Sequence, residues 1–571
     1  MSKMRICLLM FVAVVSTAVA TPAGFDTVNF VGAELLGRPT DHSVTVTVVP
    51  RTAMQVRFEY GTDTTYGQTT PAETTVADTP HFVVISGLAP DTRYYYRMRY
   101  RVLASGDSLL GAGRTFHTQR PAGETFTFAV EADPHMVPGE GDTAYAFEAT
   151  LANIAAANPD FLIDLGDNFM LDKWAVVTTD TIRERMLQYR RWWDQVCHSV
   201  PLFIVLGNHE GEQGWDLDST PTSLPVLLTN GRKPYYPNPV PDGFYSGDSI
   251  PEQFVDLRQD YYSWQWGNAL FVTLDPYWHT MTKPGDHEEL WYWTLGRAQY
   301  DWLKQTLEQS HAKFKFVFIH HLVGGNIALG ARGGSEYAHY YEWGGLRSDS
   351  TWGFDAERPG WGVPIHQLLI DNGVDVVWHG HDHFFAKQDT DGIVYQMVPQ
   401  PARTRWDSLA HQATQYGYES GVFQGPRGYV RVTMDDTSAT MDYIRTFMPA
   451  ETTQFWRNGM VSYSYTIVKH DTTGTAEVRP PRPLVGFERI APNPFRGTTL
   501  IRFQRTGIGP VQVTIFDALG RRVRALRAPQ LSFSVAWDGT DDSGKQVGAG
   551  IYHCRFTSGL YSSVARLVLM R

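Results

Sequence analysis

Five short polar segments, each following an apolar run, constrain the fold of this chain more than any other feature of its sequence. They are Asp133-Pro134-His135, Gly166-Asp167-Asn168, Gly207-Asn208-His209-Glu210, His320-His321 and Gly380-His381-Asp382-His383. The apolar runs are short and rich in branched and aromatic residues, which is typical of buried strands. Because ligands of α/β sheets bind at the carboxyl ends of strands, we expect the five segments to meet at one edge.

The region that contains these segments, residues 124–470, alternates between strand and helix patterns. We predict strands over 126–130, 161–165, 202–206, 314–319 and 374–378, and helices over 143–157, 181–197, 298–309 and 364–371. Such alternation indicates helices layered on sheets.

The side chains of the five segments form a mixed donor set. Carboxylate and amide oxygens together with imidazole nitrogens suit Fe, Zn and Mn. A shared Asp can bridge two ions about 3.5–4 Å apart, which makes a clamp for in-line displacement at phosphorus. Each segment alone also fits a surface loop, a core pair or a turn. All five in order, each closing a strand, favour a metal site.

Together the five segments resemble the calcineurin-like metallophosphoesterase family over residues 133–383. The resemblance implies a β-sandwich flanked by helices, with two divalent or trivalent metal ions of unspecified identity (Fe, Zn or Mn). It also implies that a metal-bridging hydroxide attacks the phosphorus of a small phosphate ester, either a monoester or a diester.

The same resemblance assigns a role to each residue of the motif. One metal is expected on Asp133, His135, Asp167 and His383, and the other on Asn208, His320 and His381, with Asp167 as the bridge. His209 is expected to be the general acid that protonates the leaving oxygen, and Glu210 is expected to orient it. Asp382, between two ligands, is expected beside the site rather than on a metal.

One position departs from a related subfamily. Purple acid phosphatases lack the His of the Asp-x-His motif and carry a Tyr three residues after the bridging Asp. In this chain that position is Met170, and His135 is present. The site therefore resembles the ordinary metallophosphoesterases.

The first 20 residues have the pattern of a secretory signal peptide. Lys3 and Arg5 precede a short apolar run, and Ala18-Val19-Ala20 matches a cleavage site. A membrane anchor is the alternative, but the run is short for a span. We therefore expect a protein that crosses the periplasm and is secreted or held at the cell surface, with no transmembrane segment after cleavage.

Residues 25–118 are predicted to form an all-β domain. Apolar and polar residues alternate along 44–48 and 56–60, as in half-buried strands. The spacing of Leu88, Pro90, Thr92, Tyr94 and Tyr96 resembles the tyrosine corner of fibronectin type III domains, which precede the catalytic domain in purple acid phosphatases. A generic β-sandwich is the alternative.

Residues 487–571 are predicted to form a second all-β domain, after a proline-rich linker over 471–486. Its matching segments are 491–495, 511–521, 537–541 and 548–552. They resemble the Ig-like domains related to the flagellar hook-capping protein and the C-terminal sorting domains of type IX secretion. Export machinery is therefore an expected partner, and a merely stabilising sandwich is the alternative. The fold class is thus an α/β phosphoesterase sandwich between two all-β sandwich domains.

Composition excludes several other classes. The 571 residues include 43% hydrophobic and 13% aromatic side chains, which excludes general disorder. A net charge of −11 argues against a nucleic-acid-binding surface, and three scattered cysteines do not make a thiolate metal site. The leading function is an exported dinuclear-metal phosphoesterase. The alternative is a cell-surface binding protein with an inactive phosphoesterase core.

Three other features of the region over 124–470 remain. Nine of the 17 Trp lie between Trp264 and Trp361, and we expect them to bury an insertion rather than to form a rim that stacks on a substrate ring. Arg332-Gly333-Gly334 fits a phosphate contact or a solvated turn equally well. Asp389-Thr390-Asp391-Gly392 is too short for a calcium loop and is predicted to be a hairpin turn.

Overall fold

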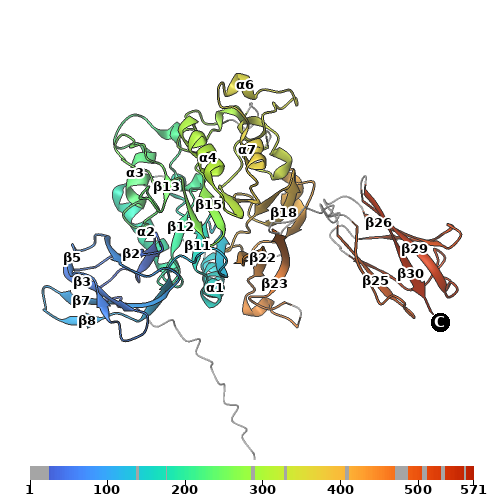
Figure 1. Ribbon diagram of the computed structural model, residues 1–571, viewed down its shortest axis with the longest axis horizontal. Helices are drawn as coiled ribbons and strands as arrows, with labels where there is room; N and C mark the ends of the chain where they lie inside the picture. The colour runs from blue at the N-terminus through green and yellow to red at the C-terminus, as the bar shows by residue number, and fades with distance from the viewer. Residues whose placement is uncertain are drawn as a thin grey trace, which may run out of the picture.

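The computed structural model describes residues 25–136, 141–174, 176–284, 290–326, 329, 331–404, 410–454, 456–469, 486–504, 511–528, 534–558 and 561–570. The predicted signal peptide lies outside these residues, and so does the predicted linker over 471–486, apart from residue 486. In chain order the elements form an all-β region, a central α/β region and a second all-β region (Figure 1).

Two sheets form the centre of the α/β region. The first has the strand order β12 (Leu202–Ile204), β11 (Phe161–Asp164), β10 (Phe126–Glu131), β21 (Gly428–Met434), β22 (Ser438–Arg445) and β23 (Val461–Val468). The second has the order β13 (Ser246–Gly247), β14 (Tyr262–Trp266), β15 (Ala269–Thr273), β16 (Phe314–Phe318), β17 (Val376–His379), β19 (Ile393–Met397), β18 (Phe385–Thr390) and β20 (Val422–Gln424).

The strands that precede the five polar segments run parallel within their sheets. β10 pairs in parallel with β11, and β11 with β12, while β15, β16 and β17 pair in parallel in the second sheet. Their carboxyl ends therefore lie at the same edge of each sheet. The five predicted strands are confirmed, with ends that differ by one to two residues.

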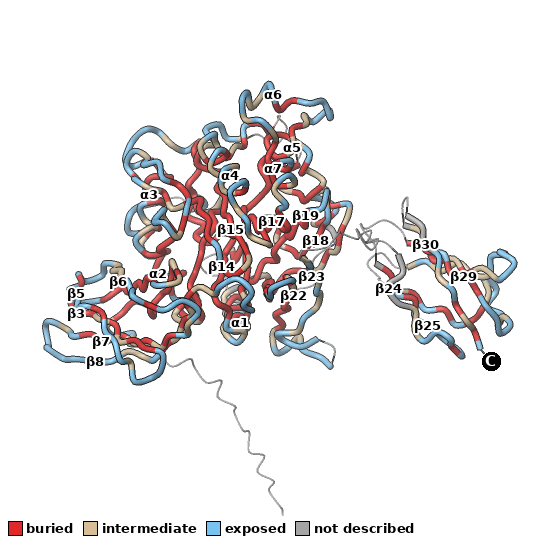
Figure 2. The backbone as a smooth tube through the Cα atoms, viewed as in Figure 1, coloured by how far each residue is buried: buried red, intermediate tan, exposed pale blue. Residues whose placement is uncertain are grey.

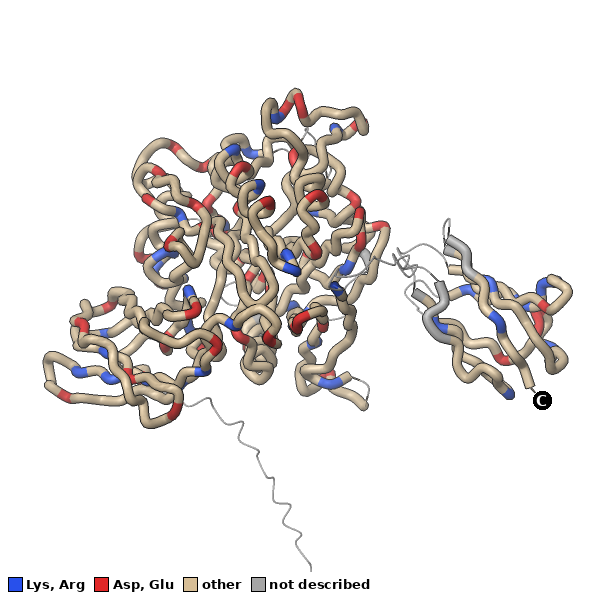
Figure 3. Tube along the Cα trace, viewed as in Figure 1, with Lys and Arg blue, Asp and Glu red and all other residues tan. Residues whose placement is uncertain are grey.

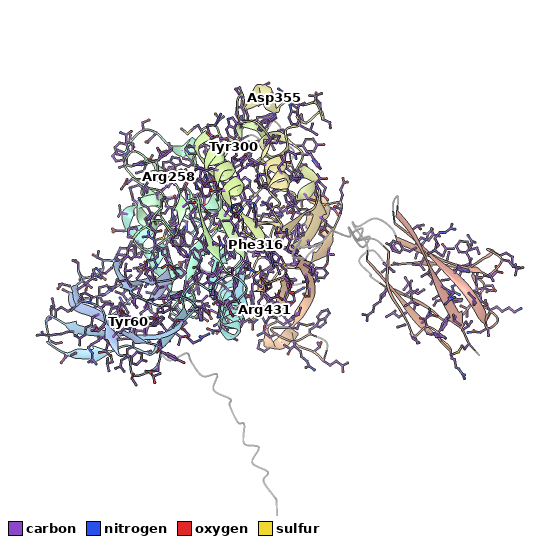
Figure 4. All side chains as sticks on the ribbon, in the orientation of Figure 1. Tyr60, Arg258, Tyr300, Phe316, Asp355 and Arg431 are labelled. Atoms are coloured by element: carbon purple, nitrogen blue, oxygen red, sulfur yellow. The ribbon has the colours of Figure 1, made fainter. Side chains whose placement is uncertain are left out.

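Helices cover the outer faces of both sheets. α1 (Gly141–Ala157), α2 (Thr179–Trp193) and α3 (Leu224–Arg232) pack on the first, and α4 (Arg297–Gln309) and α7 (Ile365–Asp371) pack on the second. The inner faces share one aromatic-rich core, which includes Phe316 near the middle of Figure 4. Figure 2 shows the buried strands between exposed outer segments. The predicted helices-on-β-sandwich architecture is present.

Shorter elements lie in the long connections. They are the helices α5 (Tyr341–Gly344), α6 (Phe354–Glu357) and α8 (Ala410–Gln415) and the 3₁₀ turns η1 (Leu171–Lys173), η2 (Asn208–Glu210), η3 (Gly214–Asp216), η4 (Leu290–Tyr292), η5 (Ser335–Tyr337) and η6 (Pro449–Glu451). The sequence pattern did not predict them, because such single turns follow tertiary contacts and lack a helical period of their own.

The N-terminal region is a two-sheet domain around one core. One sheet contains β1 (Leu35–Gly37), β2 (Ser43–Val48) and β6 (His81–Ser86); the other contains β3 (Met54–Gly61), β4 (Gln68–Thr69), β5 (Glu73–Thr74), β7 (Arg93–Val102), β8 (Ser108–Leu110) and β9 (Arg114–His117). At the predicted corner, the backbone N–H of Ala89 donates to the Tyr94 hydroxyl at 2.9 Å. The hydroxyl thus bonds back to the chain, as in a tyrosine corner.

The N-terminal domain packs against the region after α2. The Leu36 N–H donates to the Cys197 carbonyl at 2.8 Å, and the Tyr96 hydroxyl donates to the His198 carbonyl at 2.7 Å. The buried guanidinium of Arg190 on α2 donates to the Ala33 carbonyl at 2.9 Å. Backbone and side-chain bonds therefore join the two domains directly.

The C-terminal region is also a two-sheet domain. One sheet contains β24 (Gly486–Ala491), β25 (Thr499–Gln504) and β28 (Ser534–Trp537); the other contains β26 (Val511–Asp517), β27 (Arg522–Arg527), β29 (Gly550–Ser558) and β30 (Tyr561–Leu569). Its core surrounds the buried Trp537.

Residues of both charge signs occur along the described chain. In the view of Figure 3, Lys and Arg are interspersed with Asp and Glu along the described chain of all three regions. Among the described residues, no helix combines the length and apolar character that a membrane span requires.

Candidate metal centre

The edge where the parallel strands end brings the predicted Asp and His ligands together, and Asn208 lies in the wall of the same cleft. The groups of side chains that could share an ion are Asp133 with His135 and His383, His135 with Asp167 and His209, and Asp167 with His320 and His381. Within each group the ligand atoms lie within 4.8 Å of one another. The first sheet contributes the two carboxylates, and the second contributes three of the imidazoles.

Asp167 occupies the middle of this arrangement. Its Oδ2 lies 3.1 Å from His135 Nε2 and 3.2 Å from His320 Nε2. On one side, Asp133 Oδ1 lies 3.5 Å from His383 Nε2. On the other, His320 Nε2 lies 3.2 Å from His381 Nδ1. One carboxylate oxygen therefore faces two separate donor groups, which is the arrangement that a bridging ligand needs.

Several donor atoms at this edge are buried without a hydrogen-bond partner among the described residues. They are Asp133 Oδ1, Asn208 Oδ1 and His383 Nε2. Leaving a buried polar group without a hydrogen bond costs about 1–3 kcal/mol. A bound ion would remove this cost for all three atoms. Carboxylate oxygen, amide oxygen and imidazole nitrogen are all donors that first-row transition metals accept, and the set therefore fits the predicted metals.

The backbone around these donors is held in an uncommon conformation. Asp133, His135, Asp167, His381 and His383 have φ of 58°, 48°, 61°, 74° and 71°. Non-glycine residues rarely adopt this left-handed region, which costs of order 1–3 kcal/mol each where the surroundings impose it. The loops after β11 and β12 also approach each other closely, since a Cβ on Gly166 would lie 2.3 Å from the Gly207 nitrogen.

Glu210 joins two of the loops, and this corrects its expected role. Its Oε2 accepts from the N–H groups of Gly207 at 2.6 Å and Asp167 at 2.9 Å, and its Oε1 accepts from Asn168 N–H at 2.7 Å. The carboxylate is therefore fully engaged with backbone donors. It does not orient His209.

Asp172 on η1 makes the contact that was expected of Glu210. Its two carboxylate oxygens lie 2.9 and 3.0 Å from His209 Nδ1. The other ring nitrogen, Nε2, lies 4.0 Å from Asp167 Oδ2, so the ring points at the ligand cluster. The sequence analysis did not identify Asp172, because this residue does not directly follow a predicted strand. The signal that could have identified it is its position in the same loop as Asp167.

Electrostatics divides the histidines into two kinds. Burial lowers the pKa of His135 and His320, but the carboxylates of Asp133 and Asp167 outweigh it and raise both to about 9. Burial holds the pKa of His381 and His383 well below its usual value. These last two rings are therefore neutral, which is the form that binds metals.

A cleft of about 600 Å³ opens over this edge of the sheets. Its walls include Asn208, His209, Trp215, Trp293, His381 and the cations Lys173, Lys283 and Arg332. Ligand atoms, the expected acid and positive charge thus face one space. This combination suits an anionic substrate.

The tryptophan prediction holds for most of the insertion. Trp291 and Trp343 are buried beneath the connections, whereas Trp264 and Trp266 on β14 are buried in the core between the two sheets. Trp293 forms part of the cleft wall and packs edge-on against His321 with ring centroids 4.5 Å apart. Trp352, at 54% exposure, is an exception.

Arg332 matches neither of the two predicted alternatives, a phosphate contact or a solvated turn, by itself. Its Nη1 lies 3.0 Å from Asp382 Oδ1, and its guanidinium stacks over the Tyr416 ring at 4.7 Å. Asp382 also accepts from the Gly333 N–H and the Tyr418 hydroxyl, at 2.8 and 2.9 Å. Asp382 therefore holds Arg332 at the cleft wall.

Comparison with known families agrees with this geometry. Residues 126–385 match the family model of the calcineurin-like phosphoesterases. This segment, somewhat less than half of the chain, therefore resembles a calcineurin-like phosphoesterase domain. Residues 492–559 match a second family model, the FlgD Ig-like domain.

A plant phosphatase is among the known proteins that this chain resembles in sequence. Purple acid phosphatase 23 of Arabidopsis thaliana is 22% identical over 354 residues, which are 58% of this chain and 62% of the relative. The chain thus matches about three fifths of the length of that relative. The departure at Met170 lies within this phosphoesterase domain.

Two solved structures share the fold. The structure of PhoD superposes with a TM-score of 0.55 at 16% identity, over 79% of this chain and 92% of PhoD. The purple acid phosphatase PPD1 of yellow lupin (Lupinus luteus) gives 0.50 at 14% identity, over 77% of this chain and 75% of PPD1. At such identities the likeness concerns the fold of the phosphoesterase domain and its β-rich surroundings.

Proposed function

We propose that this chain is an exported hydrolase of small phosphate esters that works with two metal ions. The observation that carries the proposal is the position of Asp167, whose Oδ2 lies within 3.2 Å of imidazoles from two different donor groups. A complete donor set argues against the alternative of an inactive binding protein, since a decayed site loses ligands. The calcineurin-like phosphoesterase domain supports the same reaction class.

In this proposal Asp133, His135, Asp167 and His383 hold one ion, and Asp167, Asn208, His320 and His381 hold the other. When bound, the two ions supply Lewis acidity at the phosphoryl group and lower the pKa of water so that it can act as a nucleophile. Glu210 keeps the loops of Asp167 and Asn208 in register through its three backbone bonds. The cations of the cleft attract the anionic ester.

His209 is the proposed general acid. Asp172 binds Nδ1, which leaves Nε2 facing the ligand cluster and free to give a proton to the leaving oxygen. Such a proton transfer contributes roughly 10²–10⁴-fold to the rate. Asp172 is a positioning residue in this scheme, because it acts through the ring that it holds.

The proposal is tested by turnover of an aryl phosphate before and after exhaustive chelation. We expect the chelated protein to lose turnover and to regain it when Zn²⁺, Mn²⁺ or iron is returned. Parallel assays on monoesters and diesters then define the substrate class. Full turnover by protein that metal analysis finds empty would refute the two-metal reaction. Absence of turnover from fully loaded protein on all esters would favour the binding-protein alternative.

Export is the second part of the proposal. The signal-peptide pattern over residues 1–20 supports passage across the inner membrane, and the match of residues 492–559 to an Ig-like family supports a separate C-terminal domain with a sorting role. The tyrosine-corner bond between Ala89 and Tyr94 supports a fibronectin type III-like domain at the other end.

A further inference from the structure

A second group of potential metal ligands lies outside the candidate metal centre. It consists of His339, His366 and Asp391, whose ligand atoms lie within 4.8 Å of one another. His339 lies between η5 and α5, His366 is the second residue of α7, and Asp391 lies in the turn between β18 and β19. Three elements that are distant in sequence therefore converge on one point.

The turn that was predicted over Asp389–Gly392 supplies the carboxylate. β18 and β19 pair through Thr390 and Ile393, which leaves Asp391 and Gly392 as a two-residue connection. Both have positive φ, 51° and 86°, as a type I′ turn requires. This confirms the predicted hairpin turn and fixes the direction of the Asp391 side chain.

Both imidazoles point at the same oxygen of Asp391. His366 Nε2 lies 3.1 Å from Asp391 Oδ2, and His339 Nε2 lies 3.5 Å from it. The two rings are perpendicular, with centroids 5.3 Å apart. A single ion pair needs only one imidazole, so the convergence of both Nε2 atoms is the feature to be explained.

The Tyr395 hydroxyl can set the tautomer of His366 that binds a metal. The Tyr395 hydroxyl lies 2.7 Å from His366 Nδ1, and the Trp343 indole N–H donates to the same hydroxyl at 3.0 Å. When Nδ1 carries the proton and donates to Tyr395, the lone pair of Nε2 is free. Metal-bound histidines characteristically have such a partner on their other nitrogen.

Close packing also fixes the position of His339. Its carbonyl accepts from the Leu346 N–H at 3.0 Å, and a Cβ on Gly344 would lie 2.0 Å from its carbonyl carbon. The backbone of His339 is thus held against α5, although its side chain is half exposed, at 47%. The backbone that carries this potential ligand is therefore held in place by packing, and solvent can still reach its side chain.

A cavity of about 500 Å³ lies beside the three side chains. Its walls contain all three of them and also Trp352, Val363, Pro364 and Ile370. The space gives an ion a route in, and it leaves room for water or another small ligand on the side that the protein does not occupy.

We propose that His339, His366 and Asp391 form an additional binding site for a divalent transition metal such as Zn²⁺, separate from the candidate metal centre. Two imidazoles and one carboxylate are a set that zinc accepts with a fourth position open. A bound ion would tie α7, the segment before α5 and the β18–β19 turn together. The proposal does not depend on the hydrolase activity.

The test is a count of bound Zn²⁺ per chain after equilibrium dialysis of the full-length protein, by elemental analysis. His339→Ala removes a half-exposed ligand, and Asp391→Asn removes the carboxylate but keeps a residue that tolerates positive φ. We expect each variant to bind one ion fewer than the wild type. His42→Ala is the matched control, since His42 is an exposed partner of Asp41 and, among the described residues, belongs to no group of potential metal ligands.

Thermal unfolding gives an independent readout. A metal that binds only the folded chain stabilises it, so Zn²⁺ should raise the midpoint of the wild type more than that of His339→Ala or Asp391→Asn. Turnover of an aryl phosphate should be unchanged in both variants, which separates this site from the candidate metal centre. Equal ion counts and equal midpoint shifts in the wild type and both folded variants would overturn the proposal.

Discussion

At the scale of single residues, the two ring nitrogens of His209 have different surroundings. Asp172 binds Nδ1, and Nε2 points at the ligand cluster. An alkoxide leaving group needs a proton as its bond to phosphorus breaks, whereas a nitrophenolate leaves without one. We expect His209→Ala to lose roughly 10²–10⁴-fold in kcat on alkyl phosphates and much less on aryl phosphates, with metal content unchanged.

Asp172→Asn is the companion variant for this prediction. It keeps the shape of the side chain but weakens its hold on the ring, so we expect the same dependence on leaving group with a smaller loss. Equal losses on alkyl and aryl esters would mean that His209 orients phosphate only. Loss of a bound ion from His209→Ala would make His209 a ligand.

Asp167 should be the least replaceable carboxylate of the site. Its Oδ2 faces both donor groups, whereas Asp382 contacts Arg332, Gly333 and Tyr418. We therefore expect Asp167→Asn to lose far more kcat/KM than Asp382→Asn, together with bound metal. Metal analysis and turnover on one aryl phosphate measure both effects. Similar losses in the two variants would contradict a bridging role for Asp167.

Met170 determines the expected colour of an iron-loaded sample. An intense purple band requires tyrosinate on ferric iron, and Met170 stands where that Tyr is found in purple acid phosphatases. We expect absorption spectra of the iron-loaded protein to lack such a band. Tyr277 packs against His320 with ring centroids 6.3 Å apart, and its hydroxyl has no hydrogen-bond partner among the described residues. A purple band that disappears in Tyr277→Phe would show that the prediction is wrong.

At the scale of elements, the loops after β11 and β12 depend on one side chain. Glu210 accepts three backbone N–H groups from them. A glutamine at this position would have a single acceptor oxygen. Its amide NH₂ group would then face backbone N–H groups that need an acceptor. We expect Glu210→Gln to lower the unfolding free energy by about 1–3 kcal/mol and to weaken metal binding. Denaturant unfolding and dialysis measure these two quantities.

Glu184→Gln is the control for this experiment, because Glu184 is an exposed residue of α2. It should leave both quantities unchanged. If Glu210→Gln also bound metal and unfolded as the wild type does, the loops would be held in place without this carboxylate.

Local patterns predicted the elements better than they predicted the contacts between them. The apolar runs identified β10, β11, β12, β16 and β17, because a buried parallel strand leaves a continuous apolar signal in sequence. The polar residues that end those strands identified the donors. The sequence could not predict that Asp172, rather than Glu210, contacts His209. That contact depends on how η1 and η2 pack against each other.

The same reason explains why the group of His339, His366 and Asp391 had no signal in the sequence. Each residue lies in a different element, and only the pairing of β18 with β19 and the packing of α7 bring them within reach. Asp391 was predicted to lie in a hairpin turn, but a turn pattern does not tell which side chains it will meet.

At the scale of the whole molecule, the two all-β domains differ in how they are attached. The N-terminal domain is bonded to the region after α2, whereas the C-terminal domain follows a proline-rich sequence. We expect deletion of residues 487–571 to leave kcat/KM unchanged and to retain the protein in the periplasm. Fractionation of cells with an activity assay measures both. Normal extracellular delivery of the shortened chain would exclude a sorting role.

The position of β10 in the first sheet has a consequence for synthesis of the chain. β10, which leads to Asp133, pairs with β11 on one side and with β21 on the other. All strands of the second sheet lie between β12 and β21 in the sequence. A growing chain therefore cannot complete the sheet behind Asp133 until nearly the whole domain has been made. We therefore expect the proposed metal centre to be completed late, so that the ions present at that point compete for it.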